Sequence, residues 1–121
     1  MRYKIEITKQ TETKGLLSFV DGPVAVRATC WFKASTPIAA GTTYSAAATV
    51  MAAKLDSVTG QKRPGIFIKE FGDRGIFIHE GKDVSWSDNC VVLPRNEMMS
   101  IWNHIVDQGD KEEYVIEIAV T

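Results

Sequence analysis

Apolar and polar residues alternate along several short segments of this chain, which is the pattern of β-strands with one buried face. The N-terminal segment is the clearest case, because Tyr3, Ile5 and Ile7 alternate with Lys4 and Glu6. Within 42–51 the alanines favour a helix by propensity, but their β-branched and aromatic neighbours favour a strand. We therefore predict strands at 3–7, 16–20, 24–32, 42–51, 91–93 and 114–120.

A repeated four-residue pattern predicts a hairpin in the middle of the chain. Residues 65–68 and 75–78 both read Gly-Ile-Phe-Ile, ten residues apart. Two apolar, β-prone segments at this separation are typical of adjacent antiparallel strands. The preceding segment, 56–65, is polar and contains Gly60, Pro64 and Gly65, so we expect it to be a loop.

The period changes to that of a helix after residue 95. Asn96 is the expected N-cap and Gly109 the expected C-cap. The apolar stripe should pack on the sheet, with Trp102 as its largest core contributor, whereas His104 lies off the stripe and should be solvated. The stripe consists of Met98, Met99, Ile101, Trp102, Ile105 and Val106.

Together these segments predict a mostly β fold, a barrel or sandwich with one α-helix in the C-terminal half. The 121 residues suffice for one hydrophobic core, so we expect a single domain over 1–121. The apolar fraction of 45% and charged fraction of 24% are those of an ordinary globular protein. A net charge of −1 without charge runs gives no reason to expect a nucleic-acid or membrane partner.

The cysteine and histidine content argues against a metal site or a disulfide framework. Two cysteines and two histidines occur, with no CxxC and no HxxxH spacing, and we expect no metal and no cofactor. A single bridge between Cys30 and Cys90 remains open. Cys30, beside Trp31, is expected in the core.

One pair of residues has the chemistry of a nucleophile and its base. His79 ends an apolar run, and Cys90 begins the next apolar run eleven residues later. Taken singly, a cysteine is usually a small buried apolar residue, and such a histidine is usually structural. Taken together, an imidazole can accept the proton that a thiol must lose to become nucleophilic.

The order of motifs resembles the L,D-transpeptidase (YkuD-type) catalytic domain, and more closely its small phage and bacterial relatives, including type VI effectors. The residues that carry the resemblance are His79-x-Gly81 and Ser87-x-x-Cys90, followed by the predicted helix and last strand. A Thr-Pro pair with a downstream glycine, within 36–41, precedes them. The resemblance implies a β-rich domain with Cys90 as nucleophile, His79 as base and Ser87 shaping the loop.

The same resemblance implies a substrate, the stem peptide of peptidoglycan in the bacterial cell wall. The family forms a thioester on its cysteine and passes the acyl group to an amine or to water. Backbone N–H groups near Asn89 would stabilise the oxyanion, with Gly81 and Ser87 in supporting positions. Trp86 is a candidate wall of the substrate groove, or a cover for the core edge. Arg74 is a candidate carboxylate binder, or simply a turn charge.

The sequence departs from the family pattern beside the thiol. Asp88-Asn89 stands where the family has His-Gly, and the spacing from His79 to Cys90 is shorter. Asparagine tolerates a positive φ, so Asn89 should keep the glycine turn. A carboxylate at Asp88 raises the pKa of a neighbouring thiol and weakens it as a nucleophile.

These departures keep other functions open. The alternative is a non-catalytic phage accessory, structural or binding module on the same fold, and a third option is an inhibitor of a host protein. Residues 1–7 lack the apolar block of a signal peptide, so we expect synthesis in the cytoplasm. Action on the cell wall would then need delivery to the periplasm by phage lysis or a secretion system.

Overall fold

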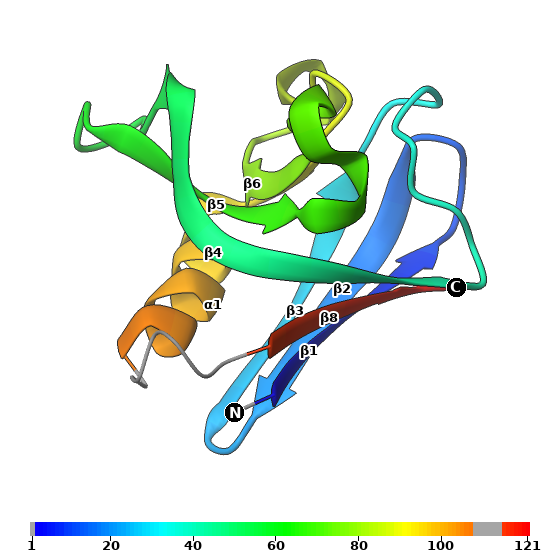
Figure 1. Ribbon diagram of the computed structural model, residues 1–121, viewed down its shortest axis with the longest axis horizontal. Helices are drawn as coiled ribbons and strands as arrows, with labels where there is room; N and C mark the ends of the chain where they lie inside the picture. The colour runs from blue at the N-terminus through cyan, green and yellow to red at the C-terminus, as the bar shows by residue number, and fades with distance from the viewer. Residues whose placement is uncertain (1, 108–114) are drawn as a thin grey trace.

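The computed structural model describes residues 2–107 and 115–121, which form eight strands, one α-helix and two short 3-10 helices (Figure 1). The strands are β1 (Arg2–Lys9), β2 (Lys14–Asp21), β3 (Val24–Trp31), β4 (Thr42–Leu55), β5 (Lys62–Ile68), β6 (Phe77–Glu80), β7 (Val91–Leu93) and β8 (Val115–Val120). The helices are η1 (Lys69–Arg74), η2 (Val84–Trp86) and α1 (Arg95–Asp107). Within this part of the chain no helix is long and apolar enough to span a membrane.

The strands close into a barrel in the order β1-β2-β3-β7-β6-β5-β4-β8. The predicted mostly β fold with one helix in the C-terminal half is confirmed, and its form is a barrel. Most neighbours are antiparallel, but β1 runs parallel to β8 and β6 runs parallel to β7. Figure 1 shows β8 beside β1, so the two ends of the chain lie in one sheet.

The alternation seen in the sequence sets the inner face of the barrel. Tyr3, Ile5 and Ile7 of β1 are buried while the residues between them are exposed. The alanine-rich segment is a strand, as its neighbours predicted. This strand, β4, pairs with β8 through its first half and with β5 through its second half. It bends across the barrel between the two pairings (Figure 1).

The predicted hairpin is present, with β5 antiparallel to β6 and η1 between them. Gly65 lies opposite His79, which places that histidine in the strand pair. The loop predicted over 56–65 is wrong for its last four residues, because β5 begins at Lys62. Pro64 is tolerated there because the register of β4 against β5 shifts between Val50 and Leu55, an irregularity of the kind that accommodates proline.

The helix α1 packs against β3, β5 and β6 and contributes to the barrel core. Its fully buried residues are Met98, Ile101 and Ile105, whereas Trp102 is only partly buried and donates its Nε1–H to the Thr49 oxygen at 3.3 Å. The helix is therefore anchored by the smaller side chains and not, as expected, by Trp102.

Two further expectations about the helix are wrong. The helix begins at Arg95, so Asn96 lies inside its first turn and is not the cap. His104 is not solvated: its side chain is 8% exposed, and its Nε2 lies 2.7 Å from Oδ2 of Asp21. The reason is its spacing, because His104 follows Ile101 by three residues and shares its buried face. Gly109 and Tyr114, the predicted C-cap and first residue of the last strand, lie outside the described residues.

Candidate functional site

The pairing of β6 with β7 places His79 and Cys90 on the same face of the sheet. Ile78 lies opposite Val91 and both belong to the barrel core. Side chains alternate along a strand, so His79 and its partner Val92 point to the other face. Cys90 precedes Val92 by two residues and shares that face, which makes it a diagonal neighbour of His79.

His79 and Cys90 line one cavity of about 280 Å³. Its other lining residues come from the bent part of β4, from the start of β6 and from the loop before β7: Met51, Ala52, Ala53, Lys54, Gly75, Phe77 and Asp88. The structure thus brings the two predicted residues into one cavity, but no hydrogen bond joins them. The Cys90 thiol accepts from the Phe77 N–H at 3.4 Å and donates to the Gly75 oxygen at 3.7 Å.

The loop that carries the thiol is fixed by its own hydrogen bonds. Ser87 is fully buried and donates its hydroxyl to the Cys90 oxygen at 2.5 Å, while the Cys90 N–H donates to the Ser87 oxygen at 2.6 Å. Asp88 and Asn89 have φ values of 44° and 67°. The left-handed conformation predicted for Asn89 is confirmed, and Ser87 holds the loop through its two hydrogen bonds with Cys90. Asn89 also accepts from the Ser35 hydroxyl at 2.5 Å.

The hydrogen bond of His79 determines where its proton lies. Nδ1 lies 2.7 Å from the Glu80 backbone oxygen, and because a carbonyl only accepts, Nδ1 is the donor. Burial lowers the pKa of His79 to about 4, helped by the positive charges of Arg63 and Lys54. The ring is therefore neutral near pH 7 and Nε2 holds its lone pair. Nε2 is buried and has no hydrogen-bond partner.

The surroundings of Cys90 keep its thiol protonated. Burial raises the pKa of Cys90, and the Asp88 carboxylate raises it further, as the sequence led us to expect. Two groups oppose this rise in pKa, the Phe77 N–H and Lys54. Lys54 reaches from β4 to place Nζ 2.7 Å from Oδ2 of Asp88, a contact that holds the pKa of Asp88 below its usual range.

The second cysteine has no part in this cavity. Cys30 is fully buried in the barrel core, and burial raises the pKa of its thiol to about 12. Both cysteines are free, so the bridge that the sequence left open between Cys30 and Cys90 is not formed.

Gly81 is positioned by packing. A Cβ at this position would lie 2.7 Å from the Cβ of Val92 and 2.8 Å from the Cβ of Trp86. Its N–H donates to the Leu93 oxygen at 2.9 Å. Gly81 therefore lets η2 approach the sheet, and its N–H is already bonded within the fold.

The contacts of the two candidate substrate binders lie outside the cavity that holds the thiol. Trp86 lines a second cavity, and the Arg63 guanidinium lies 5.3 Å from the centre of its ring. Arg74 is exposed at the end of η1, with its guanidinium 5.7 Å from the centre of the Phe71 ring. Neither residue lines the cavity that holds His79 and Cys90.

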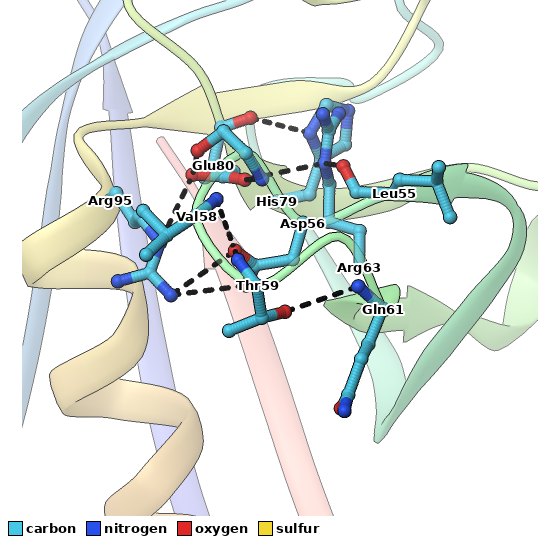
Figure 2. A network of polar contacts seen from close by, with 10 residues as sticks. Leu55, Asp56, Val58, Thr59, Gln61, Arg63, His79, Glu80 and Arg95 are labelled. Carbon is cyan, nitrogen blue, oxygen red and sulfur yellow. Dashed lines mark hydrogen bonds and ion pairs between the residues drawn. The ribbon is translucent and has the colours of Figure 1, made fainter.

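Sequence reasoning missed a buried ionic cluster next to His79 (Figure 2). The Glu80 carboxylate accepts from both the N–H and the hydroxyl of Ser57 at 2.8 Å, and lies 3.5 Å from Nε of Arg63 and Nε of Arg95. Nη2 of Arg95 donates to both oxygens of Asp56 at 3.2 and 3.1 Å. The sequence contains one indication of this cluster. Glu80 follows Ile78 by two residues in the same strand and therefore shares its inward face, and a buried carboxylate must find partners.

The cluster is ionic and holds no set of metal ligands. Burial opposes ionisation of Asp56, but hydrogen bonds from Thr59, Val58 and Arg95 outweigh it and lower the pKa of Asp56. In the part of the chain that the structure describes, no group of three or more His, Cys, Asp or Glu side chains is placed to hold a metal ion.

The fold and the site define a small closed β-barrel protein with a histidine and a thiol facing one cavity. Comparison of the chain with protein-family models, with curated proteins and with solved structures finds no match.

Proposed function

We propose that this protein is a cysteine-dependent acyl transferase of the L,D-transpeptidase type that acts on peptidoglycan stem peptides. Cys90 is the nucleophile and His79 is the general base. The observation that supports this most strongly is the state of His79: its ring is neutral, its Nε2 is buried without a hydrogen-bond partner, and the residue lines the same cavity as Cys90.

The two pKa shifts support one order of events for activation of the thiol. The pKa of Cys90 is raised and that of His79 is lowered, so the resting pair is a neutral thiol and a neutral imidazole. The proton therefore moves to Nε2 as sulfur attacks the amide carbonyl of the stem peptide. The S–C bond forms, the carbonyl oxygen becomes an oxyanion, and His79 becomes an imidazolium.

Collapse of the intermediate completes the acylation. The C–N bond breaks, and the imidazolium returns its proton to the leaving amine, which leaves a thioester on Cys90. An amine or water then attacks the thioester, with His79 again accepting a proton, and the thiol is restored. The N–H of Asn89 suits the oxyanion, because the Cys90 N–H already donates to Ser87; one such donor contributes about 3 kcal/mol in other enzymes.

A second candidate is a non-catalytic binding module, such as a phage accessory or structural protein. One observation favours it: burial and Asp88 both raise the pKa of Cys90, whereas nucleophilic cysteines usually have a depressed pKa. In this reading the loop of Ser87, Asp88 and Asn89 is kept for its turn and not for the thiol.

Turnover of defined substrates separates the two candidates. Wild type, Cys90→Ser, His79→Ala and, as a matched control, Cys30→Ala are incubated with muropeptides and tetrapeptide donors, with and without an amine acceptor, and the products are identified by mass spectrometry. The enzyme requires turnover by wild type and Cys30→Ala and its loss in the other two variants. No turnover by wild type, together with a Cys90 thiol that resists alkylation in the folded state, would support the binding module.

A further inference from the structure

A larger cavity of about 540 Å³ lies over the ionic cluster, within the size range of small-molecule sites. It is formed where the loop after β4, the end of β6, η2 and the start of α1 meet. Its lining residues are Ser57, Val58, Glu80, Gly81, Lys82, Trp86, Pro94 and Arg95. Neither His79 nor Cys90 is among them, so this cavity is separate from the one that holds the thiol.

The negative charges beside this cavity are buried and fully engaged. The side chains of Asp56 and Glu80 are only 3% and 5% exposed. Asp56 accepts from the N–H groups of Val58 and Thr59 as well as from Arg95. Glu80 is occupied by Ser57 and by its ion pairs with Arg63 and Arg95. A ligand therefore meets no carboxylate with free acceptor capacity.

The charged groups that a ligand in this cavity can reach are positive. The Arg95 side chain is 29% exposed, and its contacts within the cluster use Nη2 and Nε. Nη1 makes no hydrogen bond with the residues that the structure describes, and Figure 2 shows that end of the guanidinium pointing away from Asp56 and Glu80. Lys82, also on the cavity wall, is exposed. The cluster thus holds one guanidinium rigidly while leaving donors of that group unused.

The rest of the wall is largely apolar. Val58, Pro94 and Gly81 contribute carbon surface, and Trp86 contributes an indole. The Arg63 guanidinium, 5.3 Å from the centre of the indole ring, restrains Trp86 from one side. A flat apolar wall beside a preorganised guanidinium suits a molecule that has a planar apolar part and an anionic end.

We propose that this second cavity binds a small carboxylate with a flat apolar body. The carboxylate pairs with Nη1 of Arg95 and with Lys82, and the apolar body packs against Trp86. Binding needs neither the thiol nor its base, so this site stands independently of the acyl-transfer reaction.

A pair of near-isosteric probes tests the charge requirement. 3-Phenylpropionate and its neutral amide, 3-phenylpropionamide, are titrated into ¹⁵N-labelled wild-type protein, and the Trp86 indole and Arg95 side-chain resonances are followed by NMR. The carboxylate should shift both resonances in a saturable manner, and the amide should bind at least tenfold more weakly. Acetate should bind weakly, because it lacks the body that packs on Trp86.

Val58 offers a variant that spares the fold, because it is 70% exposed and lies on the cavity wall. Val58→Asp places a carboxylate beside Arg95 and Lys82 and should weaken binding of 3-phenylpropionate at least tenfold, whereas Val58→Asn, the neutral control of the same shape, should not. Cys90→Ala should bind like wild type. Equal binding of the carboxylate and the amide, equal binding by the two Val58 variants, or no saturable shift at Trp86 would each overturn the proposal.

Discussion

Replacing Gly81 by alanine tests whether this glycine is required for packing. The new Cβ would stand 2.7 Å and 2.8 Å from the Cβ atoms of Val92 and Trp86, each of which is bonded directly to the backbone. Such atoms cannot rotate away, so β7 or η2 must move. Gly65 provides the matched control: its added Cβ would meet Cδ2 of Phe77 at 2.9 Å and Cγ of Met51 at 3.2 Å, both side-chain atoms that can shift.

The structure predicts different costs for the two substitutions. Overpacking a fixed site costs about 1–3 kcal/mol, and Gly81→Ala should fall at the upper end. The free energy of unfolding of Gly65→Ala should lie within about 1 kcal/mol of wild type. Its smaller clash is partly offset because alanine reduces the conformational entropy of the unfolded chain, which stabilises the folded state by roughly 0.4–1 kcal/mol. Thermal melts and urea unfolding at pH 7 measure both differences. The Tm of Gly81→Ala should lie roughly 5–15 °C below that of wild type.

The contradictory result is simple to recognise. If Gly81→Ala melts within a degree or two of Gly65→Ala, the close approach of Trp86 and Val92 does not constrain this position. A normal melt combined with lost turnover would assign Gly81 a role at the substrate instead of the packing role argued from its contacts.

Three other predictions concern charge. Asp88→Asn removes a carboxylate that raises the pKa of Cys90, so alkylation of Cys90 by iodoacetamide at pH 7 should be faster than in wild type; an equal or slower rate would contradict this. The pKa of His79 falls from 6.5 to about 4 on folding, so as the pH drops the unfolded chain takes up a proton on this ring before the folded chain does. The neutral ring therefore contributes its full share to the free energy of unfolding above pH 6.5, and that free energy should fall by about 3 kcal/mol as the pH drops to 4. Urea unfolding across that range should show a flatter profile for His79→Gln, and an unchanged profile would refute the shift. Asp21→Ala removes the acceptor of the buried His104 and should cost about 1–3 kcal/mol in a thermal melt, where an unchanged Tm would contradict the contact.

The local features of the fold could be predicted from the sequence because they depend on neighbouring residues. The alternation around Ile5 and the repeated segment at 65–68 and 75–78 were sufficient to predict β1 and the β5–β6 hairpin. The parallel pairing of β1 with β8 could not be predicted, because it joins residues more than a hundred positions apart and leaves no local pattern. The strand position of Pro64 depends on a register shift in a different strand, β4.

The candidate site was predictable to a similar degree. The left-handed conformation of Asn89 followed from residue type, since asparagine tolerates a positive φ better than most residues. The ionic cluster leaves little trace in the sequence, because Asp56, Glu80 and Arg95 are far apart and only Glu80, which shares the inward face of Ile78, has a local pattern that indicates burial. His104 differs from the expectation for a related reason: the apolar residues alone define the helical stripe, so the pattern does not show that a polar histidine shares the buried face.

Capture of the acyl-enzyme tests the central claim most directly. The wild-type protein is mixed with a stem tetrapeptide, quenched in acid within seconds, and its intact mass and peptide map are measured by mass spectrometry, with Cys30→Ala and Cys90→Ala alongside. The account predicts an adduct with the mass of the acyl portion of the peptide on Cys90, in wild type and Cys30→Ala, which hydroxylamine removes. No adduct on Cys90 under any quench time, or an equal adduct in Cys90→Ala, would contradict it.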